Sequence, residues 1–167
     1  MRIIGIDPGY AIVGYGIIDY SSNHFSVVDY GAVTTKAHTP FDSRLSTIYD
    51  GLTQLISMYK PDAMSIEKLF FNTNTTTAID VAQARGVIVL AAAQGGLDIA
   101  EYTPLQVKQS VVGYGRAEKK QVQEMPRLML NLKSVPKPDD TADALALAIC
   151  HAHSAGSMLG RIKFNGG

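Results

Sequence analysis

GIDPGYAIVGYGII, residues 5–18, is the stretch that decides the fold. Three β-branched isoleucines between residues 3 and 6 predict a buried strand, and Asp7 follows them where the apolar pattern gives no reason for a charge. Pro8-Gly9 then favours a turn, after which a second apolar run begins. Because an isolated buried carboxylate is costly unless it is paired or bound to a metal, Asp7 either caps the turn or holds a ligand.

The segments around this stretch predict a mixed sheet. Strand-like runs at 2–6, 12–20 and 25–34 are separated by turn residues, so an antiparallel meander is expected. Apolar residues at three- and four-residue intervals from Leu45 to Tyr59 predict a helix that Pro61 ends. The remaining predicted elements are a strand at 63–66 ending on Glu67, a helix at 75–94, a strand near Ile99, helices around Gln106 and at 118–130, and a last helix from Asp139 or Asp140 through Ala152. This order indicates an α/β fold with helices packed on one sheet.

Two of the predicted helices have unusual features. Pro126 lies inside the helix at 118–130 and is expected to kink or shorten it. The second half of the helix at 75–94 continues into GVIVLAAAQGG, residues 86–96, which is apolar nearly all round. Such a helix is either buried at the centre of the protein or shared with a second subunit.

Length and composition indicate a folded, soluble protein. The 167 residues suffice for one domain, predicted at 1–154, with 155–167 as a disordered tail. A single cysteine, Cys150, excludes an intramolecular disulfide and fits a reducing compartment. The longest apolar run, 86–93, is shorter than the roughly 20 residues of a membrane span, and the chain starts on a strand rather than a signal peptide. A cytoplasmic location is therefore expected.

Charge is distributed unevenly along the chain although the net charge is zero. Residues 1–104 carry six basic and ten acidic side chains, whereas residues 105–137 carry seven basic and two acidic ones, a local charge of +5. The middle block is a candidate surface for a polyanion. The alternative is an ordinary solvated helix face.

Four carboxylates stand out by position. Asp7 ends the first predicted strand, Glu67 ends the fourth, and Asp140 and Asp143 lie three residues apart on one helical face. If the first and fourth strands are neighbours, their ends meet and the last helix can lay its acidic face beside them. An all-oxygen site of this kind suits Mg²⁺ or Mn²⁺ better than zinc.

Each of these acidic residues also has a purely structural alternative. Asp7 can be a turn residue, Glu67 a solvated loop charge, and the aspartates at 139–143 can satisfy a helix N-terminus and its dipole. His151 and His153 lie about two to three turns further along the last helix, at ~1.5 Å per residue, so they are expected in surface or packing roles rather than as ligands.

Five segments together carry a resemblance to a known family. They are GIDPGYAIVGYG (5–16), IEKLFFNTN (66–74), AQARGVIVLAA (82–92), QVKQSVVGYGRAEKKQV (106–122) and DDTADALALAICHAH (139–153). In this order, over nearly the whole chain, they resemble the RuvC family of bacterial Holliday junction resolvases. The resemblance implies a ribonuclease H-like fold with a five-stranded mixed sheet flanked by helices. It also implies a homodimer that cuts two opposed strands of a four-way DNA junction, in recombination and repair, with Mg²⁺.

The resemblance assigns roles to the four carboxylates. Asp7, Glu67, Asp140 and Asp143 fall on the family's catalytic, metal-binding acidic positions, whereas Asp139 falls outside the pattern. Two Mg²⁺ ions per site are implied, with Mn²⁺ as a substitute, and two ions roughly 3.5 to 4 Å apart stabilise both the attacking and the leaving oxygen. Asp7 is expected to bridge the ions, Glu67 and Asp143 to favour one each, and Asp140 to complete the site or help position the water.

The resemblance also implies DNA contacts. Lys108, Lys119 and Lys120 match lysines that contact junction phosphates, and Arg116 lies beside them. Phe70 matches an aromatic residue that stacks on a base at the opened crossover, an interaction worth about 1 to 3 kcal/mol per base. The alternative for Phe70 is a core position. Phe71 beside it is a candidate for packing inward, and the sequence leaves open which of the two contacts DNA.

Two further expectations accompany this interpretation. Gly14 and Gly16 are expected to leave the second strand free of side-chain bulk where DNA approaches. A branch-migration complex of RuvA and RuvB is a candidate partner beside four-way junction DNA and the second subunit.

Two competing functions differ from a junction nuclease in class. Asp7 and Gly9, followed by Gly14, also resemble the phosphate-binding hairpin of the actin and sugar-kinase ATPases, which need far more than 167 residues to enclose a nucleotide. Tight ATP binding by this chain would favour that alternative. The third candidate is a non-catalytic junction-binding module in which the acids are structural, and it predicts that Asp7→Asn leaves any cutting unchanged.

Overall fold

The computed structural model describes residues 1–70 and 75–156. Within them, a five-stranded sheet has the strand order β3-β2-β1-β4-β5. The strands are β1 (Arg2–Asp7), β2 (Ile12–Ser21), β3 (His24–Thr34), β4 (Ala63–Glu67) and β5 (Asp98–Tyr102). The helices are α1 (Phe41–Tyr59), α2 (Thr75–Gln94), α3 (Pro104–Val111), α4 (Lys119–Met129) and α5 (Asp139–Ala155).

The sheet is mixed, as predicted. The pairs β1–β2 and β2–β3 are antiparallel, which confirms the meander, and the pairs β1–β4 and β4–β5 are parallel. The first and fourth strands are therefore neighbours, and their carboxyl ends lie at the same edge of the sheet. This adjacency was the condition for Asp7 and Glu67 to meet.

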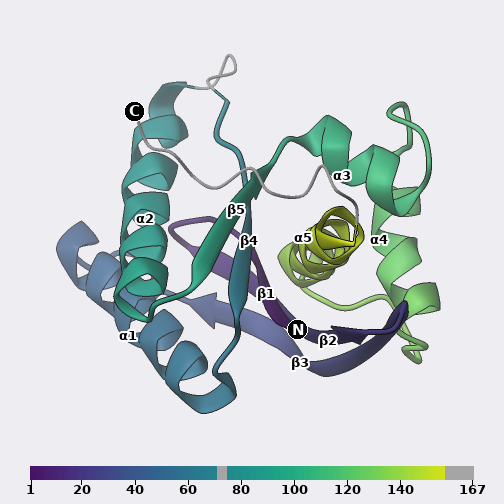
Figure 1. Cartoon of the computed structure of the whole chain (residues 1–167). Helices are drawn as coiled ribbons and strands as arrows, with labels where there is room; N and C mark the ends of the chain where they lie inside the picture. The colour runs from purple at the N-terminus through teal and green to yellow at the C-terminus, as the bar shows by residue number, and fades with distance from the viewer. Residues whose placement is uncertain (71–74, 157–167) are drawn as a thin grey trace.

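The helices form two layers, one on each face of the sheet (Figure 1). α1 and α2 cover one face, where Ile4, Ile6 and Ile17 pack against buried residues such as Ile48 and Ile88. α5 crosses the other face, with α3 and α4 beyond it (Figure 1). On that side the core is built from Ile3 and Ile18 together with the small and aliphatic residues of α5. Each face thus has its own apolar cluster.

Side-chain alternation decides which residues of β1 and β4 face α5. Successive side chains of a strand point to opposite faces, so Ile3, Gly5 and Asp7 share one face. Ser65 pairs with Gly5, and its hydroxyl donates a buried hydrogen bond of 2.7 Å to the carbonyl of Leu147 on α5. Glu67 is two residues further along the same strand. Asp7 and Glu67 therefore lie on the face that α5 covers.

The glycines of β1 and β2 make room for α5, and this corrects the expectation for Gly14 and Gly16. A Cβ on Gly5 would lie 1.9 Å from the carbonyl oxygen of Ala144, and one on Gly14 would lie 2.1 Å from that of Asp140. A Cβ on Gly16 would lie 2.5 Å from the side chain of Leu145. These contacts are with a helix of the same chain, so the missing side chains allow close helix packing rather than the approach of DNA.

Most predicted elements agree with the structure to within a few residues. α1 begins at Phe41, earlier than its apolar pattern, and α4 continues through Pro126 to Met129, one residue short of the predicted end. α5 continues to Ala155, just past the predicted domain boundary at 154, and residues 157–167 of the predicted tail lie outside the described part. The boundary itself stays a prediction.

The outer face of α2 is apolar and exposed. Ala84, Ile88 and Ala92 are buried against the rest of the protein, whereas Ile79 is 62% exposed and Leu90 is 50% exposed. Central burial, one of the two alternatives for this helix, is therefore wrong. By length and composition alone, the segment Thr76–Gln94 of α2 could cross a membrane. This differs from the expectation based on the apolar run 86–93, which is too short for a membrane span. A core helix of a soluble protein passes the same test.

Candidate active site

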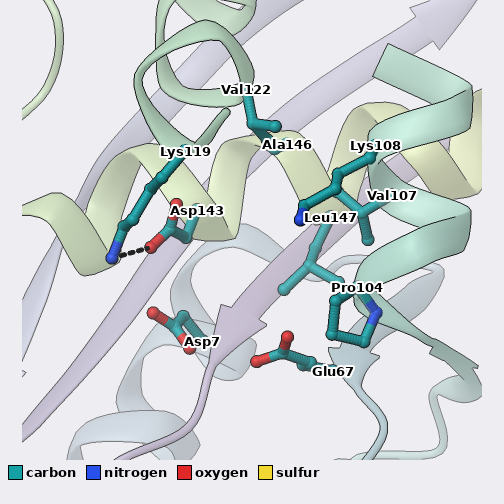
Figure 2. Close-up of a pocket in the computed structure, with 10 residues that line it drawn as sticks. All are labelled: Asp7, Glu67, Pro104, Val107, Lys108, Lys119, Val122, Asp143, Ala146 and Leu147. Carbon is teal, nitrogen blue, oxygen red and sulfur yellow. Dashed lines mark ion pairs between the residues drawn. The ribbon is translucent and has the colours of Figure 1, made fainter. Parts of the chain in front are cut away.

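Three of the four predicted carboxylates line one pocket. Asp7 at the end of β1, Glu67 at the end of β4 and Asp143 on α5 surround an open space of about 340 Å³. Their carboxylates point toward one another from three different elements (Figure 2). Apolar side chains of α3, α4 and α5 form the remaining wall, namely Pro104, Val107, Val122, Ala146 and Leu147. We call this space the carboxylate pocket.

Asp140 lies beside the carboxylate pocket without lining it. Gly14 pairs with Asp7 across β1 and β2, and a Cβ on Gly14 would touch the backbone and Cβ of Asp140. The Thr141 hydroxyl donates a 3.0 Å hydrogen bond to the carbonyl of Gly31, which fixes the first turn of α5 over β3. Asp140 is close enough to raise the pKa of Asp7. The fourth predicted carboxylate therefore flanks the other three.

Burial and mutual repulsion raise the pKa values of the pocket carboxylates. Burial, followed by the charges of Asp143, Glu67 and Asp140, raises the pKa of Asp7 to about 8. The pKa of Glu67 is also raised, first by burial and then by Asp143, and burial raises that of Asp143. Burial and repulsion thus make negative charge in the pocket costly, and a cation bound there would offset that cost.

Lys119 and Gln123, one turn apart on α4, contact Asp143. The Nζ of Lys119 lies 3.4 Å from one carboxylate oxygen of Asp143 (Figure 2). The buried side-chain amide of Gln123 donates a 3.2 Å hydrogen bond to the other oxygen. Lys119 also lowers the pKa values of Asp7 and Glu67. The lysine therefore partly neutralises the pocket, while the glutamine orients one carboxylate.

The donor set fits a divalent cation in its chemistry. Three facing carboxylates with raised pKa values are hard oxygen ligands of the kind that Mg²⁺ and Mn²⁺ prefer. Within residues 1–70 and 75–156, no three acidic, histidine or cysteine side chains are gathered closely enough to hold an ion as they stand. Asp143 is engaged by Lys119.

The predicted DNA-binding residues differ in their relation to the pocket. Lys108 on α3 and Lys119 on α4 line it, and the exposed Arg116 and Lys120 lie outside its lining. Phe70, three residues beyond Glu67, is 55% exposed. The alternative prediction, that Phe70 is a core residue, is therefore wrong. The neighbouring phenylalanine at 71 lies outside the described residues.

The histidines of α5 have the packing roles predicted for them. His151 is buried, and its Nδ1 lies 2.7 Å from the hydroxyl of Tyr102. His153 packs edge-on against Phe25. Asp139, left out of the acidic set, pairs at 2.6 Å with Lys137. None of these three points into the carboxylate pocket, since its lining contains none of them.

Two residues that support the carboxylate-bearing residues, one through a carboxylate and one through the main chain, were not predicted from the sequence. Gln123 supports Asp143, and Arg85 on α2 donates a hydrogen bond from its Nε to the main-chain carbonyl of Glu67. Gln123 lies four residues after Lys119, so a search of that helix face could have found it. For Arg85 the only signal was a lone basic residue in the middle of a largely apolar helix.

The fold and this pocket define a class of protein. Carboxylates at the ends of two neighbouring strands, faced by the acidic side of the last helix over a mixed sheet, define a ribonuclease H-like nuclease. Residues 3–151 match the sequence profile described as crossover junction endodeoxyribonuclease RuvC. The chain belongs to this RuvC family.

Individual relatives agree with the family match. The crossover junction endodeoxyribonuclease RuvC of Ruminiclostridium cellulolyticum is 60% identical over 166 residues, which cover 98% of this chain and 100% of that protein. The protein of the same name from Alkaliphilus metalliredigens is 64% identical over 154 residues, 92% and 94% of the two chains. The structure of Thermus thermophilus RuvC in complex with a Holliday junction substrate superposes with a TM-score of 0.88 at 33% identity, covering 93% of this chain and 94% of that one.

Proposed function

We propose that this protein is an endonuclease that recognises four-way DNA junctions and cuts two opposed strands by metal-dependent hydrolysis. The observation that carries this proposal is the carboxylate pocket, in which Asp7, Glu67 and Asp143 face two lysines in a chain of the RuvC family. A pocket with both basic and acidic side chains suits a phosphodiester, because the lysines attract the backbone phosphate and the carboxylates would hold a cation next to that phosphate.

The cation that we propose is Mg²⁺, two ions per site, with Mn²⁺ as a substitute. Asp7, Glu67, Asp140 and Asp143 would hold them, since their oxygens are hard donors and their raised pKa values report charge in need of neutralisation. When bound, such ions would supply charge stabilisation at the phosphate and activation of the attacking water. The apolar wall of the pocket limits water around the scissile bond.

The chain's basic residues bind and orient the DNA in this proposal. Lys108 and Lys119 approach the scissile phosphate from the pocket wall, whereas Arg116 and Lys120 contact phosphates further away. These contacts provide salt-dependent affinity with little sequence information. The exposed ring of Phe70 is free to stack on an unpaired base next to Glu67.

Paired cutting requires two pockets, and α2 offers a surface for a second copy. Ile79 and Leu90 expose large apolar side chains on its outer face, and a Cβ on Gly86 between them would meet nothing within 4 Å. Surfaces of this kind are commonly covered by a partner. We therefore propose a homodimer through α2. The branch-migration complex and the cytoplasmic location stay predictions.

The test compares a labelled synthetic four-way junction with a linear duplex of the same sequence. We expect symmetric nicks confined to the junction in Mg²⁺ and none in EDTA. Binding without cutting in Mg²⁺ and in Mn²⁺ would leave the non-catalytic junction module as the better hypothesis. Nicks of equal yield in the linear duplex would contradict selectivity for the junction.

A further inference from the structure

Arg85 joins α2 to the two strands that end beside the carboxylate pocket. Its Nη2 pairs with the carboxylate of Glu101 on β5, and its Nε donates a 3.2 Å hydrogen bond to the carbonyl of Glu67, the last residue of β4. The side chains of Arg85 and Glu101 are 13% and 23% exposed. α2 packs against β5 (Figure 1). One guanidinium thus binds two acceptors from different strands.

The peptide unit after Glu67 is held at both ends. Its carbonyl accepts from Arg85, and its N–H, which belongs to Lys68, donates a 2.9 Å hydrogen bond to the carbonyl of Tyr102. β1 pairs with β4 only as far as Ile66, so Glu67 lacks the support of a strand on that side. The two hydrogen bonds fix the peptide plane, and with it the direction in which the Glu67 side chain leaves the backbone.

Strand alternation places Arg85 and the Glu67 side chain on opposite faces of the sheet. Glu101 pairs with Ile66, so it faces α2, whereas the Glu67 carboxylate faces α5. Because Glu101 neutralises Arg85, the pair adds little net charge near the pocket. The influence of Arg85 on Glu67 is therefore one of orientation rather than of charge.

We propose that Arg85 is a positioning residue, which holds the backbone of Glu67 so that its carboxylate faces the metal site of the carboxylate pocket. This inference rests on the proposed function, because it assigns a metal ligand role to Glu67. A planar guanidinium can bind both acceptors at fixed angles, whereas an ammonium group cannot. Arg85 therefore acts through geometry that lysine does not reproduce.

Arg2 provides a matched control for Arg85, because it makes similar contacts but does not line the carboxylate pocket. Its Nε and Nη2 bind the carboxylate of Asp19, and its Nη1 donates a 2.8 Å hydrogen bond to the carbonyl of Tyr59. Like Arg85, it joins a carboxylate on a strand to a main-chain carbonyl. Arg2→Ala thus removes a comparable set of contacts elsewhere on the sheet.

The experiment measures metal binding directly and through cutting. Free Mn²⁺ is titrated into wild type, Arg85→Ala, Arg85→Lys and Arg2→Ala, with its loss followed by electron paramagnetic resonance. The Mg²⁺ dependence of junction cutting is then measured with the same four proteins. We expect Arg85→Ala to weaken Mn²⁺ binding and to raise the Mg²⁺ concentration for half-maximal cutting about tenfold or more, as supporting contacts to metal ligands typically do. Junction affinity in EDTA should match that of the wild type.

The variants separate positioning from stability. Arg85→Lys retains the charge opposite Glu101 and should fold, yet it should still need at least severalfold more metal. Arg2→Ala should lower the melting temperature without moving the metal curve. If both Arg85 variants show the metal curve of the wild type, the positioning role is overturned. Should Arg85→Ala not fold, a wild-type metal curve in Arg85→Lys alone overturns it. If the wild type itself fails to cut junctions in either metal, the proposed function fails instead.

Discussion

Replacing Asp7 by asparagine should stabilise the metal-free protein while abolishing strand cutting. The half-buried Asp7 carboxyl has its pKa raised from 3.8 to about 8, first by burial and then by the neighbouring carboxylates. Between these two pH values the folded protein keeps a proton that the unfolded chain has lost, so its stability falls as pH rises. Asparagine has nearly the same shape and does not ionise, so the variant escapes this penalty.

The size of the effect follows from the width of that pH interval. From 3.8 to pH 7 is about 3 pH units, each worth about 1.4 kcal/mol, which gives a penalty of up to about 4 kcal/mol at pH 7. For a chain of this length, each kcal/mol corresponds to roughly 2 to 4 °C in melting temperature. A rise of at least about 5 °C is therefore expected in Asp7→Asn at pH 7.

Thermal melts in EDTA between pH 4 and 8 test this reasoning. The difference between Asp7→Asn and wild type should be near zero at pH 4 and grow steadily toward pH 8. Asp50→Asn, on the exposed side of α1, is the control and should melt like the wild type throughout. Adding Mg²⁺ should stabilise the wild type more than Asp7→Asn. A variant less stable than the wild type at pH 7, or a difference independent of pH, would refute the account of Asp7 as a buried, repelled carboxylate.

Four further substitutions test other parts of the structure. Lys119→Ala should weaken binding to all junction sequences alike and lower the slope of log affinity against log salt by about one, as measured by fluorescence anisotropy. Phe70→Ala should cost about 1 to 3 kcal/mol in junction opening, read from a fluorescent base at the crossover, and an unchanged signal would remove Phe70 from the DNA contacts. Gly14→Ala should cost about 1 to 3 kcal/mol of stability and reduce cutting, because its Cβ would lie 2.1 Å from the carbonyl of Asp140; a wild-type melt would contradict that packing. Leu90→Glu should yield monomers in sedimentation and single rather than paired nicks, and a dimeric variant would exclude this face of α2 as the interface.

The position of most elements could be predicted from the sequence because the signals are local. Alternating β-branched residues, the Pro8-Gly9 turn and apolar residues at helical intervals each depend on neighbours a few residues away. For the same reason Asp140 and Asp143 could be placed on one helix face. At Pro126 the pattern predicts a kinked or shortened helix, and α4 continues past the buried proline to Met129.

The composition of the site depended on contacts between distant parts of the chain. Their positions at strand ends and on one helix face singled out Asp7, Glu67 and Asp143, and the resemblance to a family assigned their roles. Their meeting depends on the parallel pairing of β1 with β4 and on the crossing of α5. No local pattern distinguishes a glycine that admits DNA from one that admits a helix, so the role of Gly14 was misjudged.

The sequence by itself determined which residues form strands and helices and which carboxylates end them, since these properties follow from periodicity and turn chemistry along the chain. Only the tertiary structure decided that Asp140 flanks the pocket, that Gln123 supports Asp143 and that Arg85 holds the end of β4. Hydrogen bonds such as that between Arg85 and Glu67 join residues far apart in sequence, and their existence depends on how the layers pack against the sheet.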